Sequence, residues 1–164
     1  MIKKRGVTLM ELIVVIAIIA ILATIAIPNY LRIKQETRRG DATSAVIATE
    51  GIVERYLSEN NKANLDSGDM ALSQFSDYAV GSGTPVLSNA GYYLITIVPD
   101  TTFYTINATA IADGTTNACS AVSDPESFDQ CADTACWVIS ISNGEKQSTN
   151  STGVVADAAT TTCW

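Results

Sequence analysis

Residues 1–27 read MIKKRGVTLMELIVVIAIIAILATIAI, and this stretch decides how the chain is organised. Three cations at positions 3–5 precede an apolar run that extends to Ile27. A short basic segment followed by an apolar one is typical of a targeting signal whose positive end stays in the cytoplasm. The small residue in a cleavage-like setting is Gly6, which lies before the apolar run. Cleavage after Gly6 would therefore leave the apolar segment on the mature protein.

The apolar segment has the length and composition of a membrane span. From Leu12 to Ile27 every residue is apolar except Thr24. At about 1.5 Å per residue, a helix from Val7 to Ile27 spans on the order of 30 Å, the thickness of one hydrocarbon core. The sequence therefore predicts a transmembrane helix over residues 7–27.

Glu11 is the residue that a plain membrane anchor does not explain. A carboxylate within a membrane helix costs about 2.5–3.5 kcal/mol at the bilayer centre and less near its ends, unless a partner neutralises it. Cleavage after Gly6 would create a cationic α-amino group on Val7. We therefore expect Glu11 to pair with a Val7 amine, either its own or that of the next subunit.

The string GVTLMEL, which begins at Gly6, resembles the prepilin signature of type IV pilins and of type II secretion pseudopilins. The resemblance extends over residues 3–30. It implies that a dedicated membrane peptidase cuts between Gly6 and Val7 and N-methylates Val7. It also implies that Glu11 pairs with the Val7 amine during assembly. The family usually has Phe at the first mature position, where this chain has Val7.

The helix is predicted to continue beyond the membrane segment, over residues 7–60. Pro28 lacks an amide donor, so we expect a kink there. Past Pro28 the pattern becomes amphipathic, and apolar or small residues recur at three- and four-residue steps: Ala42, Ala45, Val46, Thr49, Ile52, Val53, Tyr56 and Leu57. This face is expected to pack on a sheet. The helix is expected to end near Asn60 and Asn61.

The remaining residues, 61–164, predict a globular head. Residues 61–91 are expected to form a connecting loop with one helical turn near Leu72 to Phe75. Strand signals then cover residues 92–98, 103–110 and 136–142, followed by an Asn143-Gly144 hairpin turn into residues 145–148. We expect an antiparallel sheet of three or four strands within residues 92–164, and a Ser/Thr/Ala-rich loop over residues 147–162. The fold class is α+β, which corresponds to the ladle fold of the pilins that the chain resembles.

Four cysteines lie in the last third of the chain: Cys119, Cys131, Cys136 and Cys163. Behind an export signal they are expected to form two disulfides. Of the three possible connectivities we favour Cys119–Cys131, which closes a short acidic loop, and Cys136–Cys163, which ties down the C-terminus. A zinc site is the alternative, but the spacings do not match paired ligands and the chain has no His.

Charge is distributed unevenly along the chain. The whole chain carries a net charge of −7, and removal of residues 1–6 leaves seven cations against seventeen acids. From Asp66 onward Lys146 is the one cation, against eleven acids. Such a head repels phosphate, so we expect no direct nucleic-acid binding. The acidic residues of 113–133 lack calcium-loop spacing, and we expect no metal or cofactor. Arg32, Lys34, Arg38 and Arg39 form a basic cluster, which fits either lipid headgroups and solvent or an intersubunit salt-bridge patch.

Three classes of function are compared. The absence of His and of any Cys beyond the expected disulfides disfavours an enzyme. A membrane-anchored binding module is one alternative. We favour a structural subunit of a type IV pilus, most like a minor pilin, because the Cys163-Trp164 end and the expected disulfides resemble minor pilins of the PilE kind. A major pilin or a type II secretion pseudopilin is the other alternative.

The resemblance also implies partners and location. Before assembly we expect a single-pass protein in the lipid bilayer of the bacterial inner membrane, with its head in the periplasm. The expected partners are the prepilin peptidase, the inner-membrane assembly platform and other pilin subunits, which the N-terminal helix contacts. After assembly the chain is expected in an extracellular pilus that serves attachment, motility or DNA uptake.

Overall fold

A computed structural model describes residues 8–79, 85–100, 102–112, 118–119, 131, 133, 136–142, 144–150, 155–157 and 163–164. The elements follow in the order α1 (Leu9–Glu59), the 3₁₀ helices η1 (Asp69–Ala71) and η2 (Ser76–Tyr78), and the strands β1 (Val86–Leu87), β2 (Tyr93–Pro99), β3 (Tyr104–Ala110), β4 (Val138–Ser142), β5 (Glu145–Thr149) and β6 (Val155–Asp157). The chain divides into two compact units, Met1–Gln35 and Glu36–Trp164, and the division falls within the sequence of α1. The predicted α+β class is confirmed.

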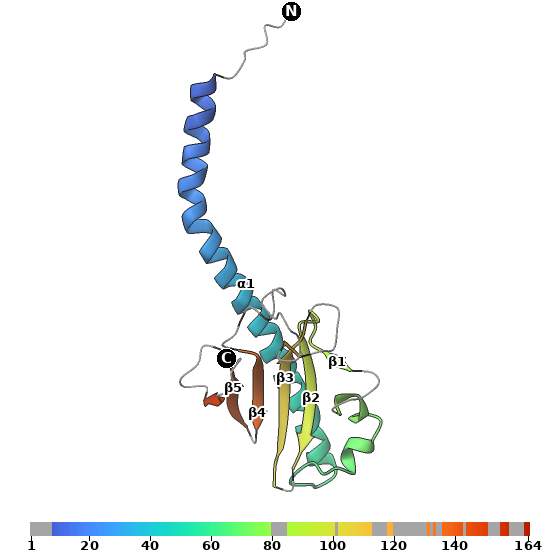
Figure 1. Cartoon of the computed structure of the whole chain (residues 1–164). Coiled ribbons are helices and arrows are strands. Elements are labelled where there is room, and N and C mark those ends of the chain that lie inside the picture. The colour runs from blue at the N-terminus through green and yellow to red at the C-terminus, as the bar shows by residue number, and fades with distance from the viewer. Residues whose placement is uncertain are drawn as a thin grey trace, which may run out of the picture. The chain divides into compact units, whose positions relative to one another are not determined.

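The C-terminal half of α1 packs on the sheet with the face that its sequence pattern predicts. Figure 1 shows this half of the helix crossing behind β2 and β3. The residues that α1 buries recur at three- and four-residue steps: Arg38, Ala42, Val46, Thr49, Val53 and Leu57. The apolar ones among them share one core with the inward side chains of the sheet, which include Ile95, Ile106 and Ile139. Removing this apolar surface from water is the main stabilisation of the head.

The end of α1 agrees with the sequence prediction. Asn61 has a φ of 51°, in the left-handed region that Asn tolerates, and the Lys62 N–H donates to the Leu57 carbonyl at 2.9 Å. This arrangement satisfies a carbonyl of the last helical turn and turns the chain back over the helix. In its N-terminal half, α1 continues through Pro28. The predicted kink at Pro28 stays a prediction.

The sheet is a six-stranded antiparallel meander in the order β1-β2-β3-β4-β5-β6. Ile95 lies opposite Ala108, and Ala108 lies opposite Ile139, so buried side chains align across β2, β3 and β4. Successive side chains alternate between faces, and the inward ones meet α1. At the predicted hairpin turn, Gly144 has a φ of 78°; Asn143 lies outside the described residues.

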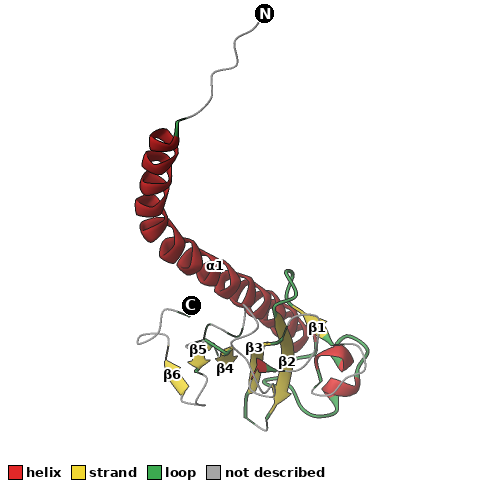
Figure 2. Ribbon diagram, turned by 45° about the horizontal axis from the view of Figure 1, so that its top comes forward, coloured by secondary structure: helices red, strands yellow, loops and turns green. Residues whose placement is uncertain are grey.

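The sheet has more strands than the three or four that we expected. β1 lies within the stretch predicted as a connecting loop, and β6 lies within the Ser/Thr/Ala-rich stretch predicted as a loop. Figure 2 shows β6 beside β5 at one edge and the short helices beside β1 at the other. The single turn expected near Leu72 to Phe75 is replaced by η1 and η2, which flank it. Strands of two or three residues carry too little alternation to be recognised in a sequence.

Candidate functional site

The N-terminal half of α1 exposes its apolar side chains. Every large apolar side chain from Leu9 to Ile27 is between 48% and 75% exposed. The helix is long and apolar enough to cross a membrane, and none of its most apolar 18-residue window is buried within the chain. Such a surface is stable only against lipid or against another protein surface.

The first turn of α1 contains a reciprocal cap between Thr8 and Glu11. The Glu11 N–H donates to the Thr8 hydroxyl oxygen at 3.2 Å, and the Thr8 N–H donates to Glu11 Oε2 at 3.4 Å. This is a capping box, in which each side chain satisfies a backbone donor at the helix start. The cap also holds the Glu11 carboxylate at the positive end of the helix dipole. The cap is not among the sequence predictions, and the Thr-x-x-Glu spacing is the signal that identifies it.

The predicted cleavage and methylation site lies next to this cap. Gly6 and Val7 are outside the described residues, so the expected pairing of Glu11 with a Val7 amine stays a prediction. Thr8 directly follows Val7, and consecutive Cα atoms are about 3.8 Å apart. The N–H that Glu11 binds therefore belongs to the residue that directly follows Val7 in the sequence.

Two disulfides fix the C-terminal part of the head. Cys119 bonds to Cys131 and Cys136 bonds to Cys163, the pairs that we favoured from the sequence. Trp164, next to the second bridge, donates its indole N–H to the Gln147 carbonyl at 2.9 Å. The second bridge therefore ties the C-terminus to Cys136, just before β4, and the indole hydrogen bond ties it to β5.

A largely buried ion pair joins the disulfide region to α1. Arg39 Nε lies 2.6 Å from Asp133 Oδ2, and Arg39 Nη2 donates to Asp133 Oδ1 at 2.8 Å. The side chains are 15% and 7% exposed, respectively. The paired hydrogen bonds raise the pKa of Arg39 against the opposing effect of burial. One member of the predicted basic cluster thus binds one member of the predicted acidic stretch within the chain.

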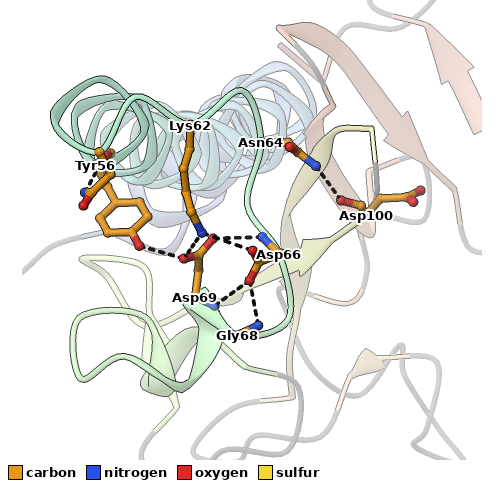
Figure 3. Close-up of polar contacts among 8 residues, drawn as sticks. Tyr56, Lys62, Asn64, Asp66, Gly68, Asp69 and Asp100 are labelled. Atoms are coloured by element: carbon orange, nitrogen blue, oxygen red, sulfur yellow. Dashed lines mark hydrogen bonds and ion pairs between the residues drawn. The ribbon is translucent and has the colours of Figure 1, made fainter.

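A second polar cluster, which we call the Lys62 cluster, lies just after α1 and consists of Tyr56, Lys62, Asp66 and Asp69 (Figure 3). The Lys62 ammonium is 2.5 Å from Asp69 Oδ1 and 3.1 Å from Asp66 Oδ2. The Tyr56 hydroxyl donates to the same Asp69 oxygen at 2.7 Å. The backbone N–H groups of Gly68 and Asp69 donate to Asp66 Oδ1 at 2.8 and 3.0 Å. An ammonium group thus occupies the space between the two carboxylates.

The Lys62 cluster changes the pKa values of its members. Hydrogen bonds to Asp69 and then to Asp66 raise the pKa of Lys62 to about 12. Burial raises the pKa of Asp69, but the hydrogen bonds from Lys62 and Tyr56 outweigh it, and the net pKa is below the usual value. The Asp69 N–H and the Lys62 ammonium lower the pKa of Asp66. All three groups are therefore charged at neutral pH, and the cluster holds the segment after α1 against the helix end.

The described part of the chain contains no group of three or more His, Cys, Asp or Glu side chains placed to hold a metal ion. Most of the acidic stretch, including Asp113, Asp124, Glu126 and Asp129, lies outside the described residues. The candidate functional site is therefore the N-terminal helix with its cap, carried by a disulfide-bonded head.

Comparison with protein families identifies the chain. The model of the family described as "Type IV minor pilin ComP, DNA uptake sequence receptor" matches residues 28–123, more than half of the chain. The chain belongs to this family of type IV minor pilins. A second model, the prokaryotic N-terminal methylation motif, matches residues 1–27 of the minor pilin. The two matches adjoin at Pro28, where the apolar run ends.

Curated relatives match the minor pilin over a shorter length. The type II secretion system core protein G of Pectobacterium carotovorum subsp. carotovorum is 35% identical over 60 residues, which are 37% of this chain and 38% of that protein. The protein of the same name from Klebsiella pneumoniae is 36% identical over 60 residues, 37% of this chain and 43% of that protein. The chain thus covers well under two thirds of these relatives, and no solved structure matches it.

These findings confirm the predicted family and location. A methylation motif followed by an exposed apolar helix assigns the minor pilin to the inner membrane before assembly and to the extracellular pilus after it. The family is structural rather than catalytic. The relatives in type II secretion agree with the broader pilin and pseudopilin grouping that the N-terminal signature predicts.

Proposed function

We propose that this chain is processed after Gly6, N-methylated at Val7 and built into a type IV pilus as a minor subunit through α1. The observation that carries the proposal is the exposed apolar helix, in which Glu11 is the one charged residue between Thr8 and Leu31. In the bilayer the apolar side chains contact lipid. In a filament they would contact the helices of neighbouring pilins, and close helix packing would replace the lipid contacts.

Glu11 favours the transfer of the helix from lipid to the filament. Its carboxylate disfavours deep insertion in lipid, and a Val7 amine supplies the compensating charge. If the amine belongs to the neighbouring subunit, the pair forms only on assembly. Removing one partner of such a desolvated pair costs about 2 kcal/mol or more, which corresponds to on the order of thirtyfold in an equilibrium constant.

The proposed partners follow from this mechanism. The prepilin peptidase acts at Gly6 and Val7, the inner-membrane assembly platform extracts the subunit from lipid, and other pilins receive its helix. The head provides a contact surface and does not catalyse a reaction, so we propose no enzymatic activity. Minor rather than major status predicts trace amounts of this chain in purified pili.

Quantitative immunoblots of sheared pili test the role of Glu11. We expect Glu11→Gln to lower incorporation by about thirtyfold. Glu59→Gln makes the same chemical change at an exposed position at the end of α1, and we expect it to leave incorporation unchanged. Closed disulfides in both variants would report a folded head. Equal incorporation of both folded variants would contradict the proposed pairing.

DNA reception is a second candidate function, because the description of the matching family names a DNA uptake sequence receptor. The charge of this head disfavours it. From Asp66 onward the head has eleven acids and Lys146 as its one cation, so this part of the head releases few counterions from DNA and its phosphate contacts supply little affinity. We therefore propose that the minor pilin serves assembly and does not hold DNA by itself.

Fluorescence anisotropy with the full chain in detergent separates the two functions. We expect binding of a short duplex to be weaker than a typical non-specific dissociation constant of about 10⁻⁴ M at physiological salt. Tight binding that distinguishes one duplex sequence from a scrambled one would establish a receptor and overturn the assembly-only proposal.

A further inference from the structure

A groove of about 470 Å³ opens in the head between α1 and the β1 edge of the sheet. Its helix wall includes Ala48 and Ile52, and its other wall includes Leu87 of β1 and Tyr78 of η2. Ile95 of β2, which is 1% exposed, also lines it. The groove lies within the compact unit Glu36–Trp164, so both of its walls belong to the same unit.

The lining is mostly apolar and carries no charge. None of the described residues that line the groove carries a charge, although the chain from Asp66 onward has eleven acids and one cation. Leu87 is 43% exposed and Ala48 is exposed, while the polar side chains are limited to neutral groups such as those of Ser44 and Asn89. An apolar site in a strongly acidic head fits an uncharged apolar occupant.

The helix wall favours close approach by another helix. Ser44, Ala48 and Ile52 are four residues apart and lie along one side of α1, and Ala45 also lines the groove. Small side chains let the backbone of a second helix come close, as they do between packed membrane helices. The wall is also continuous in sequence with the segment of α1 that carries the proposed assembly surface.

We propose that this groove receives the apolar N-terminal helix of a neighbouring pilin subunit in the filament. The inference rests on the proposed function, because it requires incorporation through α1. The occupant is a helix equivalent to Leu12–Ile27 of this chain, which has no charge to desolvate and presents Ile and Leu side chains at every turn. One subunit then offers the helix and the next offers the groove. Such a heterologous contact propagates into a helical filament instead of closing into a dimer.

Site-specific photocrosslinking in assembled pili tests the groove. A benzoylphenylalanine side chain at position 87 of the full chain is expected to crosslink to the apolar N-terminal segment of another pilin, as mapped by mass spectrometry. The matched control places the same group at Thr96, whose side chain points to the opposite face of β2 from Ile95. This control is expected to give no adduct with that segment.

The outcomes separate the two proposals. Absence of the chain from pili would overturn the proposed function. If the chain is present in pili but position 87 crosslinks to a pilin head or to lipid, the groove assignment alone is overturned. The same holds if position 87 gives no adduct. Adducts with the apolar segment support it.

A substitution pair gives an independent check. Ala48→Glu places a carboxylate in the groove and is expected to lower incorporation by about tenfold or more, because burying a charge without a partner costs over about 1.4 kcal/mol. Ala63→Glu makes the same change at an exposed position after α1 and is expected to have no effect. Closed disulfides and an unchanged near-ultraviolet spectrum report folding of both full-length variants. Normal incorporation of folded Ala48→Glu would overturn the inference.

Discussion

Replacing Asp133 by Asn removes the carboxylate charge that faces the Arg39 guanidinium. Both hydrogen bonds of the pair are short, at 2.6 and 2.8 Å, and the two side chains are 7% and 15% exposed. The Asn side chain keeps one acceptor but turns an NH₂ group toward a cation. Breaking a buried ion pair by removing one partner typically destabilises by about 3–5 kcal/mol. Because Arg39 retains slight solvent access, we expect a loss of about 3 kcal/mol for Asp133→Asn.

Urea unfolding of the full chain in detergent, followed by near-ultraviolet circular dichroism, measures this loss. Trp137 is a suitable probe because its indole N–H donates to the Cys131 carbonyl at 3.0 Å, close in sequence to Asp133. Glu59→Gln is the control, and an exposed substitution of this kind changes the unfolding free energy by less than about 0.5 kcal/mol. The reasoning is refuted if Asp133→Asn unfolds within that same margin of the wild type.

A double-mutant cycle isolates the pair itself. We expect Arg39→Met alone to destabilise, because it leaves the Asp133 carboxylate buried opposite an apolar side chain. The double variant Arg39→Met with Asp133→Leu is expected to be more stable than either charge-removing single variant, since matched apolar groups replace a buried ion pair at little net cost. Strictly additive free energies would show that the two side chains do not interact.

Three further predictions concern stability and helix structure. The Lys62–Asp69 pair is expected to stabilise the head fully between pH 3.8 and 10.5. This stabilisation is lost as the pH falls through the lowered pKa of Asp69, or as it rises through the Lys62 pKa of about 12. In urea unfolding measured at a series of pH values, Lys62→Met should remove the pair's contribution at both ends of this range. Thr8→Val should weaken the cap by about 1 kcal/mol and speed amide exchange in the first turn of α1. Gly144→Ala should lower the unfolding free energy by about 1–2 kcal/mol, because the φ of Gly144 is 78°. Gly51→Ala should raise the unfolding free energy by up to about 1 kcal/mol, because Gly51 is helical and a Cβ there meets no atom within 4 Å. Urea midpoints would show both changes.

The long elements could be predicted because their patterns are long. Apolar residues at three- and four-residue steps from Ala42 to Leu57 identified the face of α1 that packs on the sheet. The β-branched and aromatic runs gave β2, β3 and β4 to within two residues of their bounds. In each case many residues follow the same spacing, so one or two exceptional residues do not obscure the pattern.

Short elements and long-range pairs could not be predicted in this way. β6 lies within a Ser/Thr/Ala-rich stretch, and its strand form depends on pairing with β5 rather than on its own composition. η1 begins where the Asp66 carboxylate accepts the backbone N–H groups of Gly68 and Asp69, a local side-chain-to-backbone contact that the sequence prediction of a turn near Leu72 did not include. Arg39 and Asp133 are 94 residues apart, and only the folded sheet and disulfides bring them together.

The sequence indicated which residue is important in the functional site, but not which side chains and backbone groups it contacts. Glu11 stands out in the sequence because it is a lone carboxylate in an apolar segment. Its capping contact with Thr8 depends on where the helix begins, which the apolar run alone does not fix. The groove beside α1 needs two walls from distant segments, Ala48 on the helix and Leu87 on β1, so no single stretch of sequence reveals it.

Mass spectrometry of sheared, purified pili tests the central claim most directly. We predict a peptide that begins with N-methylated Val7, together with head peptides of this chain in trace amounts relative to the main subunit. The account is contradicted if the chain is absent from pili and the protein recovered from membranes still begins at Met1.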